Sequence, residues 1–474
     1  MDQIQEFIKV FYLMSLSSDD KDSKELAKFG YRQDLNRTMR RFSSFAVSFS
    51  LISILTGIFA NFHFGFSQVG NFIPISWTIV FAGQFIVALI MAELSVNYPI
   101  SGYGYQWSYR LVGPKLGFIT GWLLLMQFLT GFPGICKALS FLISDLIYQN
   151  FAINVSSLFI SVLIIWIITF IHLNGINLVS KINNIGVVTE IIGIVMLIIF
   201  LVYFLVNKTD LEISLNFNDY KLPDFNIKSF ALSILLGAWC LTGFEAAADM
   251  SEETNNPKNT VPKSIKHSLI SSGILGLIII ILSTVFLSTN NYEKINNNYL
   301  TDMLQFEFGM PIYLLTLIFI IIAIFACGVA CMATASRLIF SMSRDSILPK
   351  SNWLSFIDNN KSPSNSLLFI GIISTLFIII FDKIEMITSV SAISGYIGYC
   401  GIIFSSFFLT GKNTINKIPK ILKIIALIWC VFVALCLLLP GQAVEGFNFE
   451  YIHAISLIVF LIIGFFVYLY KFSK

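Results

Sequence analysis

The sequence predicts an all-α polytopic membrane protein. Hydrophobic residues make up 56% of its 474 residues, charged residues make up 12%, and the mean hydropathy is +0.80. Soluble globular domains carry about 25% charged residues, so this composition excludes an ordinary soluble protein. Apolar stretches of about 20 residues, each long enough to cross a bilayer as a helix, recur along the chain. We therefore expect twelve transmembrane helices and no separate soluble domain.

The positions of the spans and the basic residues between them predict the topology. The predicted spans lie near residues 45–64, 72–93, 116–147, 155–173, 184–206, 229–250, 265–289, 312–342, 366–382, 386–410, 422–439 and 450–470. With a cytoplasmic N-terminus, 24 of the 30 Lys and Arg fall in cytoplasmic segments or at the cytoplasmic ends of spans, five fall on the outer face, and Lys137 lies deep inside a span. Because basic residues concentrate in cytoplasmic loops, we expect both termini in the cytoplasm and the protein in the cytoplasmic membrane.

The tripeptide Leu-Thr-Gly occurs in the middle of the first span, at residues 55–57, and of the sixth, at residues 241–243. A glycine at the centre of a membrane helix frees backbone groups that lipid cannot satisfy. Such a break is tolerated where those groups face protein or a watery cavity. Two breaks, five spans apart, predict an internal repeat with one binding site between its halves.

The segment 93–107, between the second and third spans, is too polar to cross the membrane and unusually rich in aromatic residues. We expect a cytoplasmic amphipathic helix or a re-entrant turn at the membrane interface, where Tyr and Trp are favoured. The alternative is an interfacial anchor without a mechanistic role.

Several motifs, in order along the chain, point to one family. They are residues 42–50 followed by 53–57, residues 92–107, residues 242–245, residues 251–257 with Val261-Pro262, and Ser336-Arg337 with Ser343-Arg344-Asp345 and Pro349. In this order they resemble the permeases of the amino acid, polyamine and organocation (APC) superfamily, and most closely its GABA and choline permease branch. The resemblance covers essentially the whole chain.

The resemblance implies the leucine-transporter fold. In that fold helices one to five and six to ten form inverted repeats, here residues 42–206 and 207–410. Residues 1–41 would be a cytoplasmic tail, and residues 411–474 would hold helices eleven and twelve, outside the core. Helices one and six unwind at mid-membrane in this fold. One departure is that the frequent Gly-Ser-Gly of helix one reads Leu55-Thr56-Gly57 here, which changes the shape of the pocket.

A zwitterionic amino acid needs an anion site for its carboxylate and acceptors for its ammonium group. The second half of a broken first helix begins with unpaired N–H groups and a positive dipole end, which suits a carboxylate. We expect Gly57 to offer its N–H and Thr56 its hydroxyl group. The carbonyl groups of Ser53, Trp239 and Thr242 would accept from the ammonium group, and the resembling positions play these roles in the family. The alternative is that the breaks only make the helices flexible.

The second break, at Gly243, is flanked by Trp239 and Phe244. Aromatic side chains beside a mid-membrane site commonly act as lids between the substrate and one aqueous face, and ordinary packing is the alternative. Glu245 lies two residues beyond Gly243, and we expect it to couple transport of the substrate to movement of a proton. A carboxyl group in a low-dielectric site takes up and releases a proton as the cavity opens to either side. The alternative is a structural acceptor that holds the unwound backbone.

Further polar residues in the spans are accessory candidates. Asp249 lies one turn beyond Glu245 towards the cytoplasm, and Glu190 is expected near the cytoplasmic end of helix five; either would be a gate or relay group. A sodium site is a second possibility for coupling, with Ser53 on helix one and Thr334 on helix eight as contributors.

Lys137 lies about two thirds of the way along the third span, towards the outer side. A lysine at this depth is costly and is usually paired or faces water. It would either read a side-chain carboxylate of the substrate or bond to nearby carbonyl groups while snorkelling. The predicted depth of Glu190 argues against a pair between the two residues.

The remaining chemistry is sparse. All seven cysteines fall in predicted spans, where we expect them to pack as small apolar residues, and Cys327 and Cys331 share a helical face without metal-ligand partners. No nucleophile and base share a common depth, and no phosphate-binding Gly-x-x-x-x-Gly-Lys-Ser/Thr loop occurs. We expect no catalytic residue, no metal, no cofactor and no nucleic-acid partner.

These observations predict a secondary active transporter and not an enzyme. It would move an amino acid, a GABA-like molecule or a related amine across the lipid bilayer by alternating access, coupled to protons. Sodium coupling, exchange without a coupling ion, and an amino acid sensor without flux are the alternatives.

Overall fold

The computed structural model describes residues 18–207, 226–289, 299–381, 383–410, 414–438 and 452–472. In these residues the fold is helical, and the one extended pairing is an isolated bridge between Met39 and Thr254. The helices of the N-terminal half are α2 (Ser18–Ala27), α3 (Arg41–Ile52), α4 (Ile54–Val69), α5 (Ile73–Asn97), α6 (Tyr103–Leu111), α7 (Pro114–Phe151), α8 (Ser157–Leu173) and α9 (Ile176–Asn207).

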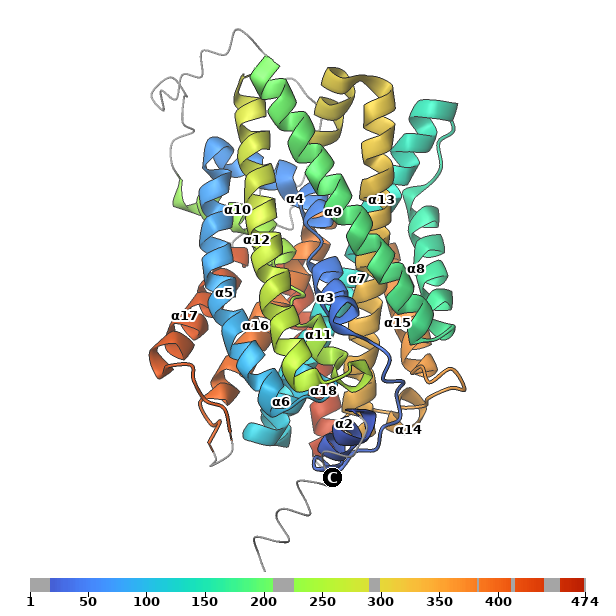
Figure 1. The fold of residues 1–474 in the computed structure, drawn as a ribbon, viewed down its shortest axis with the longest axis vertical. Helices are drawn as coiled ribbons and strands as arrows, with labels where there is room; N and C mark the ends of the chain where they lie inside the picture. The colour runs from blue at the N-terminus through green and yellow to red at the C-terminus, as the bar shows by residue number, and fades with distance from the viewer. Residues whose placement is uncertain are drawn as a thin grey trace, which may run out of the picture.

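The C-terminal half continues the bundle (Figure 1). Its helices are α10 (Ile227–Cys240), α11 (Ala246–Asp249), α12 (Pro257–Thr289), α13 (Tyr299–Arg344), α14 (Ser351–Leu354), α15 (Ser364–Ile380), α16 (Ile384–Ser406), α17 (Lys420–Leu437) and α18 (Ile452–Phe472). Short 3₁₀ turns cover Gly70–Phe72 and Ser251–Glu253.

These helices account for every predicted span. Among the described residues, eight helical stretches are long and apolar enough to cross a membrane, and the first, Arg41–Asn97, contains two of the predicted spans. Three shorter apolar helices, Ser157–Leu173, Ile227–Cys240 and Ser364–Ile380, match the other predicted spans. The prediction of an all-α polytopic membrane protein is therefore confirmed.

Two of the spans are interrupted. The sixth ends its first half at Cys240 and turns at Gly243, whose φ of 98° lies in the left-handed region that favours glycine. The first is interrupted at Ser53, with φ 33° and ψ 93°. The predicted site of this first break, at Thr56 and Gly57, is therefore wrong by a few residues. Both residues belong to the first turn of α4, because the Ser53 side chain and carbonyl accept their N–H groups.

Corresponding helices of the two halves pack in corresponding ways. The helix α7 of the first half packs along α16 of the second half. The helix α13 of the second half likewise packs along α9 of the first half. In order of spans, the third helix packs on the tenth, and the eighth packs on the fifth. The third and eighth helices occupy the same place in their repeats, and so do the fifth and tenth, so the two pairs are equivalent. The helices α4 and α10, which carry the breaks, lie against each other. The division of the chain at residues 206 and 410 stays a prediction, since residues 208–225 and 411–413 lie outside the described ones.

The last two spans lie at the edge of the bundle. The helix α17 packs on α16, α10 and α5, and α18 packs on α16 and α7. Large apolar side chains of α18 stay exposed, among them Phe465 and Phe466 at 58% and 64%. A surface of this kind is stable where it faces lipid.

Candidate transport site

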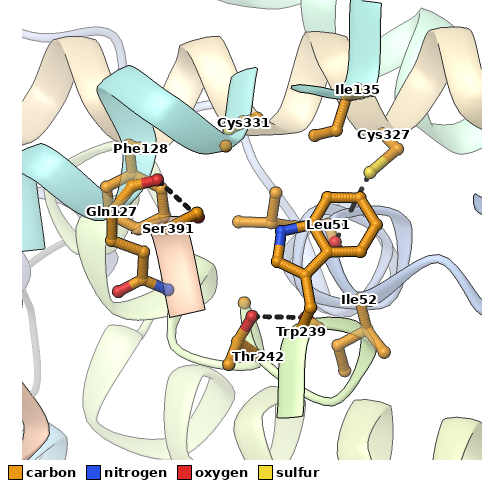
Figure 2. Close-up of a pocket in the computed structure, with 12 residues that line it drawn as sticks. Leu51, Ile52, Gln127, Phe128, Ile135, Trp239, Thr242, Cys327, Cys331 and Ser391 are labelled. Carbon is orange, nitrogen blue, oxygen red and sulfur yellow. Dashed lines mark hydrogen bonds between the residues drawn. The ribbon is translucent and has the colours of Figure 1, made fainter. Parts of the chain in front are cut away.

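A small cavity lies where the two broken spans meet. Its walls come from α3, α7, α13 and α16 and from the break after α10 (Figure 2). Its volume is about 30 Å³. A single water molecule needs roughly 10–15 Å³ of cavity volume. Pockets for drug-sized ligands span roughly 300–1,000 Å³. In this conformation the walls have closed to a space for a few waters, so a substrate requires side chains to move.

Three predicted site residues, Trp239, Thr242 and Gly243, line this cavity. The Thr242 hydroxyl donates to the Trp239 carbonyl at 2.7 Å, so it fastens the turn after α10. Figure 2 shows the indole of Trp239 extending into the cavity. Of the carbonyls expected to accept from an ammonium group, that of Trp239 thus already has a partner.

The predicted residues of the first span, Ser53, Thr56 and Gly57, do not line the cavity. The hydroxyls of Ser53 and Thr56 lie 2.6 Å apart, and the Gly57 N–H donates to the Ser53 carbonyl at 3.0 Å. The expected role of the Gly57 N–H as a free donor is therefore not available in this conformation. The Gly57 N–H is already used in the first turn of α4.

The structure explains the glycine at position 57 by a close contact between two helices. A Cβ atom at this position would lie 2.3 Å from Cys240 Sγ and 2.5 Å from Cys240 Cβ, so the absence of a side chain lets α4 approach α10. The tripeptide that predicted a break therefore marks a close helix crossing in the first span.

The crossing predicts a stability experiment. Gly57→Ala should lower the free energy of unfolding by about 1–3 kcal/mol, the usual cost of overpacking. Adding Cys240→Gly should restore part of the loss, whereas Cys240→Ala, which keeps the obstructing Cβ, should not. Apparent melting temperatures of the purified variants measure this, and equal melting of both double variants would contradict the assignment.

Glu190 is placed differently from the prediction. The helix α9 begins at Ile176, eight residues before the predicted span, so Glu190 lies near the middle of a 32-residue helix. The predicted position near the cytoplasmic end is wrong, because the polar first turns of α9 hid its true start. The Glu190 Oε1 atom accepts from Ser53 Oγ at 3.0 Å and from the Leu55 N–H at 3.4 Å.

Glu245 lies behind the second break and not on the cavity wall. Its Oε1 accepts from the Tyr399 hydroxyl at 2.6 Å and its Oε2 from the Gly243 N–H at 3.0 Å. The side chain is fully buried. The Phe244 ring packs 6.1 Å from that of Tyr399, and Phe244 does not line the cavity either. The carboxyl group thus holds the unwound backbone, and its part in coupling stays a prediction.

Thr334, a predicted contributor to a sodium site with Ser53, hydrogen-bonds within its own helix. The Thr334 hydroxyl donates to the Ala330 carbonyl of its own helix at 3.0 Å. Cys327, seven residues earlier on α13, contacts the Leu51 carbonyl at 3.5 Å. Seven residues correspond to roughly 10 Å along a helix. Thr334 thus lies about this far from Cys327 along α13, while Ser53 follows Leu51 along the first span, and a sodium site shared by the two residues stays a prediction.

Lys137 is buried on α7, next to the start of α8. Its Nζ atom lies 3.4 Å from Ser157 Oγ and 5.0 Å from the centre of the Phe141 ring. These contacts fit the alternative in which the ammonium group bonds to nearby protein groups. Lys137 is not among the residues that line the cavity.

The end of the bundle that holds α2, α6 and α14, here called the α2 end, is closed by buried ion pairs. Arg337 donates to both carboxylate oxygens of Glu253 at 2.9 and 2.8 Å, and Arg344 donates to both of Glu252 at 2.9 and 2.8 Å. Asp249, predicted as a gate residue, lies in the same layer, where its Oδ1 accepts from the Gly102 N–H at 2.9 Å.

Aromatic residues of segment 93–107 reinforce this closure. The side chains of Tyr103, Tyr105 and Trp107 are fully buried in protein. The alternative of a simple interfacial anchor is therefore wrong for these residues. Tyr105 donates to Asp345 Oδ2 at 2.7 Å, which ties α6 to the end of α13.

The N-terminal segment adds a further layer. The Arg344 guanidinium lies 3.6 Å from the centre of the Tyr31 ring, and the Tyr31 hydroxyl donates to Asp345 Oδ1 at 2.7 Å. Burial, together with the nearby Asp345 carboxylate, raises the pKa of Tyr31 to about 12. The phenol therefore keeps its proton at neutral pH and remains a donor.

The opposite end of the bundle is more open. A cavity of about 830 Å³ there is lined by residues of α4, α7 and α13, including Ala138 and Ile324. Ile135 and Cys327, which line the small central cavity, precede or follow these residues by three positions, about one helical turn. The large cavity thus ends about one turn from the central one.

The amino-acid sequence has relatives among known proteins. Residues 40–468 match the family model described as amino acid permease. The chain belongs to this family. The predicted membership of the APC superfamily is therefore confirmed.

Known relatives of this permease cover most of its length. It is 26% identical to amino-acid permease BAT1 of Arabidopsis thaliana over 462 residues, which is 89% of each chain. It is 25% identical to the thiamine transporter thi9 of Schizosaccharomyces pombe, over 78% of this chain and 71% of the relative. The low-affinity putrescine importer PlaP of Escherichia coli is 22% identical over 65% of this chain and 67% of its own.

Several residues that line the central cavity were not predicted from the sequence. Gln127 and Phe128 on α7, Ser391 on α16, and Cys327 with Cys331 on α13 all line the central cavity. The shared helical face of the two cysteines was visible, yet apolar packing was the expected role. Nothing local in the sequence singles out Gln127 or Ser391, since many spans carry one polar residue.

Proposed function

We propose that this permease is a secondary active transporter that moves an amino acid or an amine by alternating access. The observation that carries the proposal is the central cavity between the two broken spans, separated by about one helical turn from the large cavity and by several buried layers from the α2 end. Opening of the α2 end with closure of the other would expose the same cavity to the opposite side.

The α2 end faces the cytoplasm in this proposal. The excess of Lys and Arg in the segments at this end supports that orientation, because basic loops stay on the cytoplasmic side. The conformation is then one that is closed to the cytoplasm. Glu245, buried behind the Gly243 turn, is the residue proposed to carry a proton.

Uptake into proteoliposomes tests the function. The purified permease should concentrate a radiolabelled amine or amino acid when the outside is more acidic, and a protonophore should abolish the accumulation. Liposomes without protein give the background. Replacing sodium by potassium or choline should leave uptake unchanged if protons are the coupling ion, and failure of every amino acid and amine to cross would reject the proposal.

Trp239→Ala should reduce the initial rate of uptake at least tenfold while the protein remains folded. The indole forms much of the cavity wall, so its loss removes contact area from the substrate and leaves the cavity open. Trp353, which is 45% exposed at the α2 end, provides the matched control, since Trp353→Ala removes the same side chain away from the cavity. Equal uptake by both variants would contradict the role of Trp239.

A further inference from the structure

The amino end of α4 is already occupied by an acid of the chain itself. Such helix ends carry unpaired N–H groups and a positive dipole, and they bind anions. Here Glu190 Oε1 accepts from the Leu55 N–H and from Ser53 Oγ, at 3.4 and 3.0 Å. The N–H groups of Thr56 and Gly57 bond to the side chain and carbonyl of Ser53, at 3.3 and 3.0 Å.

The second break follows the same rule. The Gly243 N–H, the donor freed by the turn, bonds to Glu245 Oε2 at 3.0 Å. At both breaks a glutamate therefore accepts from a backbone N–H group that a substrate carboxylate would otherwise use. A carboxyl oxygen accepts these hydrogen bonds whether or not the glutamate carries a proton.

No cationic side chain compensates for the missing donors at the cavity wall. Among the described residues that line the central cavity, none is Lys, Arg or His. The buried Arg337 is held by both oxygens of Glu253. Lys137 lies against Ser157 and Phe141 and does not line the cavity.

The groups that do line the cavity suit a cation. Trp239 and Phe128 present aromatic rings, whose faces attract ammonium groups. Gln127 also lines the cavity, and its buried amide Oε1 packs beside Gly395 without a hydrogen-bond partner among the described residues. Glu190 and Glu245 stand behind the two breaks that border the cavity.

We propose that the substrate is an organic amine that carries positive charge and lacks a carboxylate, and that Glu190 excludes carboxylated analogues. The inference rests on the proposed function, because it assigns the substrate class of the same cavity. A substrate carboxylate at the amino end of α4 would have to displace Glu190 and then lie beside it.

Matched pairs of ligands that differ only in a carboxylate test this. The purified permease is titrated with putrescine and ornithine, cadaverine and lysine, phenethylamine and phenylalanine, and tryptamine and tryptophan, with choline as an additional cation. In the pair that binds best, the amine should bind at least tenfold more tightly. A free amino acid that binds as well as every amine overturns the inference, and so does a lack of binding by all the amines.

Variants of Glu190 separate a role in specificity from a merely structural one. Glu190→Ala should lower the preference for the amine at least tenfold, because it frees the Leu55 N–H and the Ser53 hydroxyl for a substrate carboxylate. Glu190→Gln keeps an acceptor oxygen for both donors and should keep the preference. Glu190→Asp should keep the preference. Glu93 offers the matched control, since it is another buried glutamate whose Oε2 accepts from backbone N–H groups, those of Lys417 and Ile418. Glu93→Ala should leave the ligand preference unchanged.

Monodispersity and melting temperature confirm folding of each variant before binding is compared. If Glu190→Ala fails to fold, Ser53→Ala, which removes one donor to Glu190, should lower the same preference for the amine. An unchanged preference in folded Glu190→Ala, or in folded Ser53→Ala where Glu190→Ala does not fold, overturns the role of Glu190. Binding decides the inference and uptake decides the proposed function. An amine that binds without crossing rejects transport alone, and uptake of amino acids in preference to amines rejects the inference alone.

Discussion

Arg337→Met should destabilise the permease by about 3–5 kcal/mol, because it leaves the Glu253 carboxylate buried without its partner. Both side chains are almost completely buried, at 1% and 0% exposure, and two hydrogen bonds join them. The apparent melting temperature of the purified protein measures the effect. This is the largest loss of stability that we expect from a single substitution at the α2 end.

Two further variants make this prediction specific. Arg337→Met combined with Glu253→Met removes the buried charge altogether and should recover most of the loss, since well-packed apolar pairs often replace buried ion pairs at little cost. Lys258→Met breaks the pair with Glu25, in which the side chains are 41% and 31% exposed, and should cost about 0–1 kcal/mol. Equal destabilisation by Arg337→Met and Lys258→Met would contradict the assignment.

Glu245→Gln should abolish proton-driven accumulation, with a loss of at least tenfold in the steady-state level of substrate. Glutamine keeps the size of the side chain and an acceptor oxygen for the Gly243 N–H or Tyr399, yet it cannot take up and release a proton. Exchange of labelled for unlabelled substrate across the membrane should persist. Uptake with and without a pH gradient separates the two activities.

Tyr399→Phe is the matched variant for this experiment. It removes the hydroxyl that lies 2.6 Å from Glu245 Oε1 and retains the carboxyl group. Coupling should survive, with a changed pH of half-maximal uptake. If Glu245→Gln accumulated substrate with the pH dependence of the unaltered protein, Glu245 would be only a structural acceptor for the unwound backbone.

The sequence predicts the twelve spans and the second break well, and both successes have a local cause. A span needs about 20 consecutive apolar residues, and Gly243 supplies the positive φ that the turn requires. Trp239, Thr242 and Gly243 lie at the cavity, as expected from their distance to that turn.

The first break could not be placed from local sequence. Ser53 adopts a positive φ that serine rarely takes, and its hydroxyl contacts Glu190, which lies 137 residues away along the chain. Backbone strain of this kind persists only when surrounding structure enforces it. The partner, Glu190, was itself predicted near the cytoplasmic end of its helix, whereas it lies near the middle of α9.

The ion pairs of the α2 end were missed for the same reason. Arg337 and Glu253 are 84 residues apart, and Arg344 and Glu252 are 92 residues apart. Their motifs were conspicuous in the sequence, where two arginines recur after two helical turns and two glutamates follow the sixth span. A one-dimensional pattern shows such charges but does not pair them.

The contact between Tyr31 and Asp345 sets an order of events during biosynthesis. The two residues are separated by 314 positions. At a translation speed of about 5–20 residues per second, the ribosome needs roughly 15–60 s to progress from one to the other. The contact between the N-terminal segment and the end of α13 can therefore form only after the eighth span has been synthesised, when most of the spans have already been made.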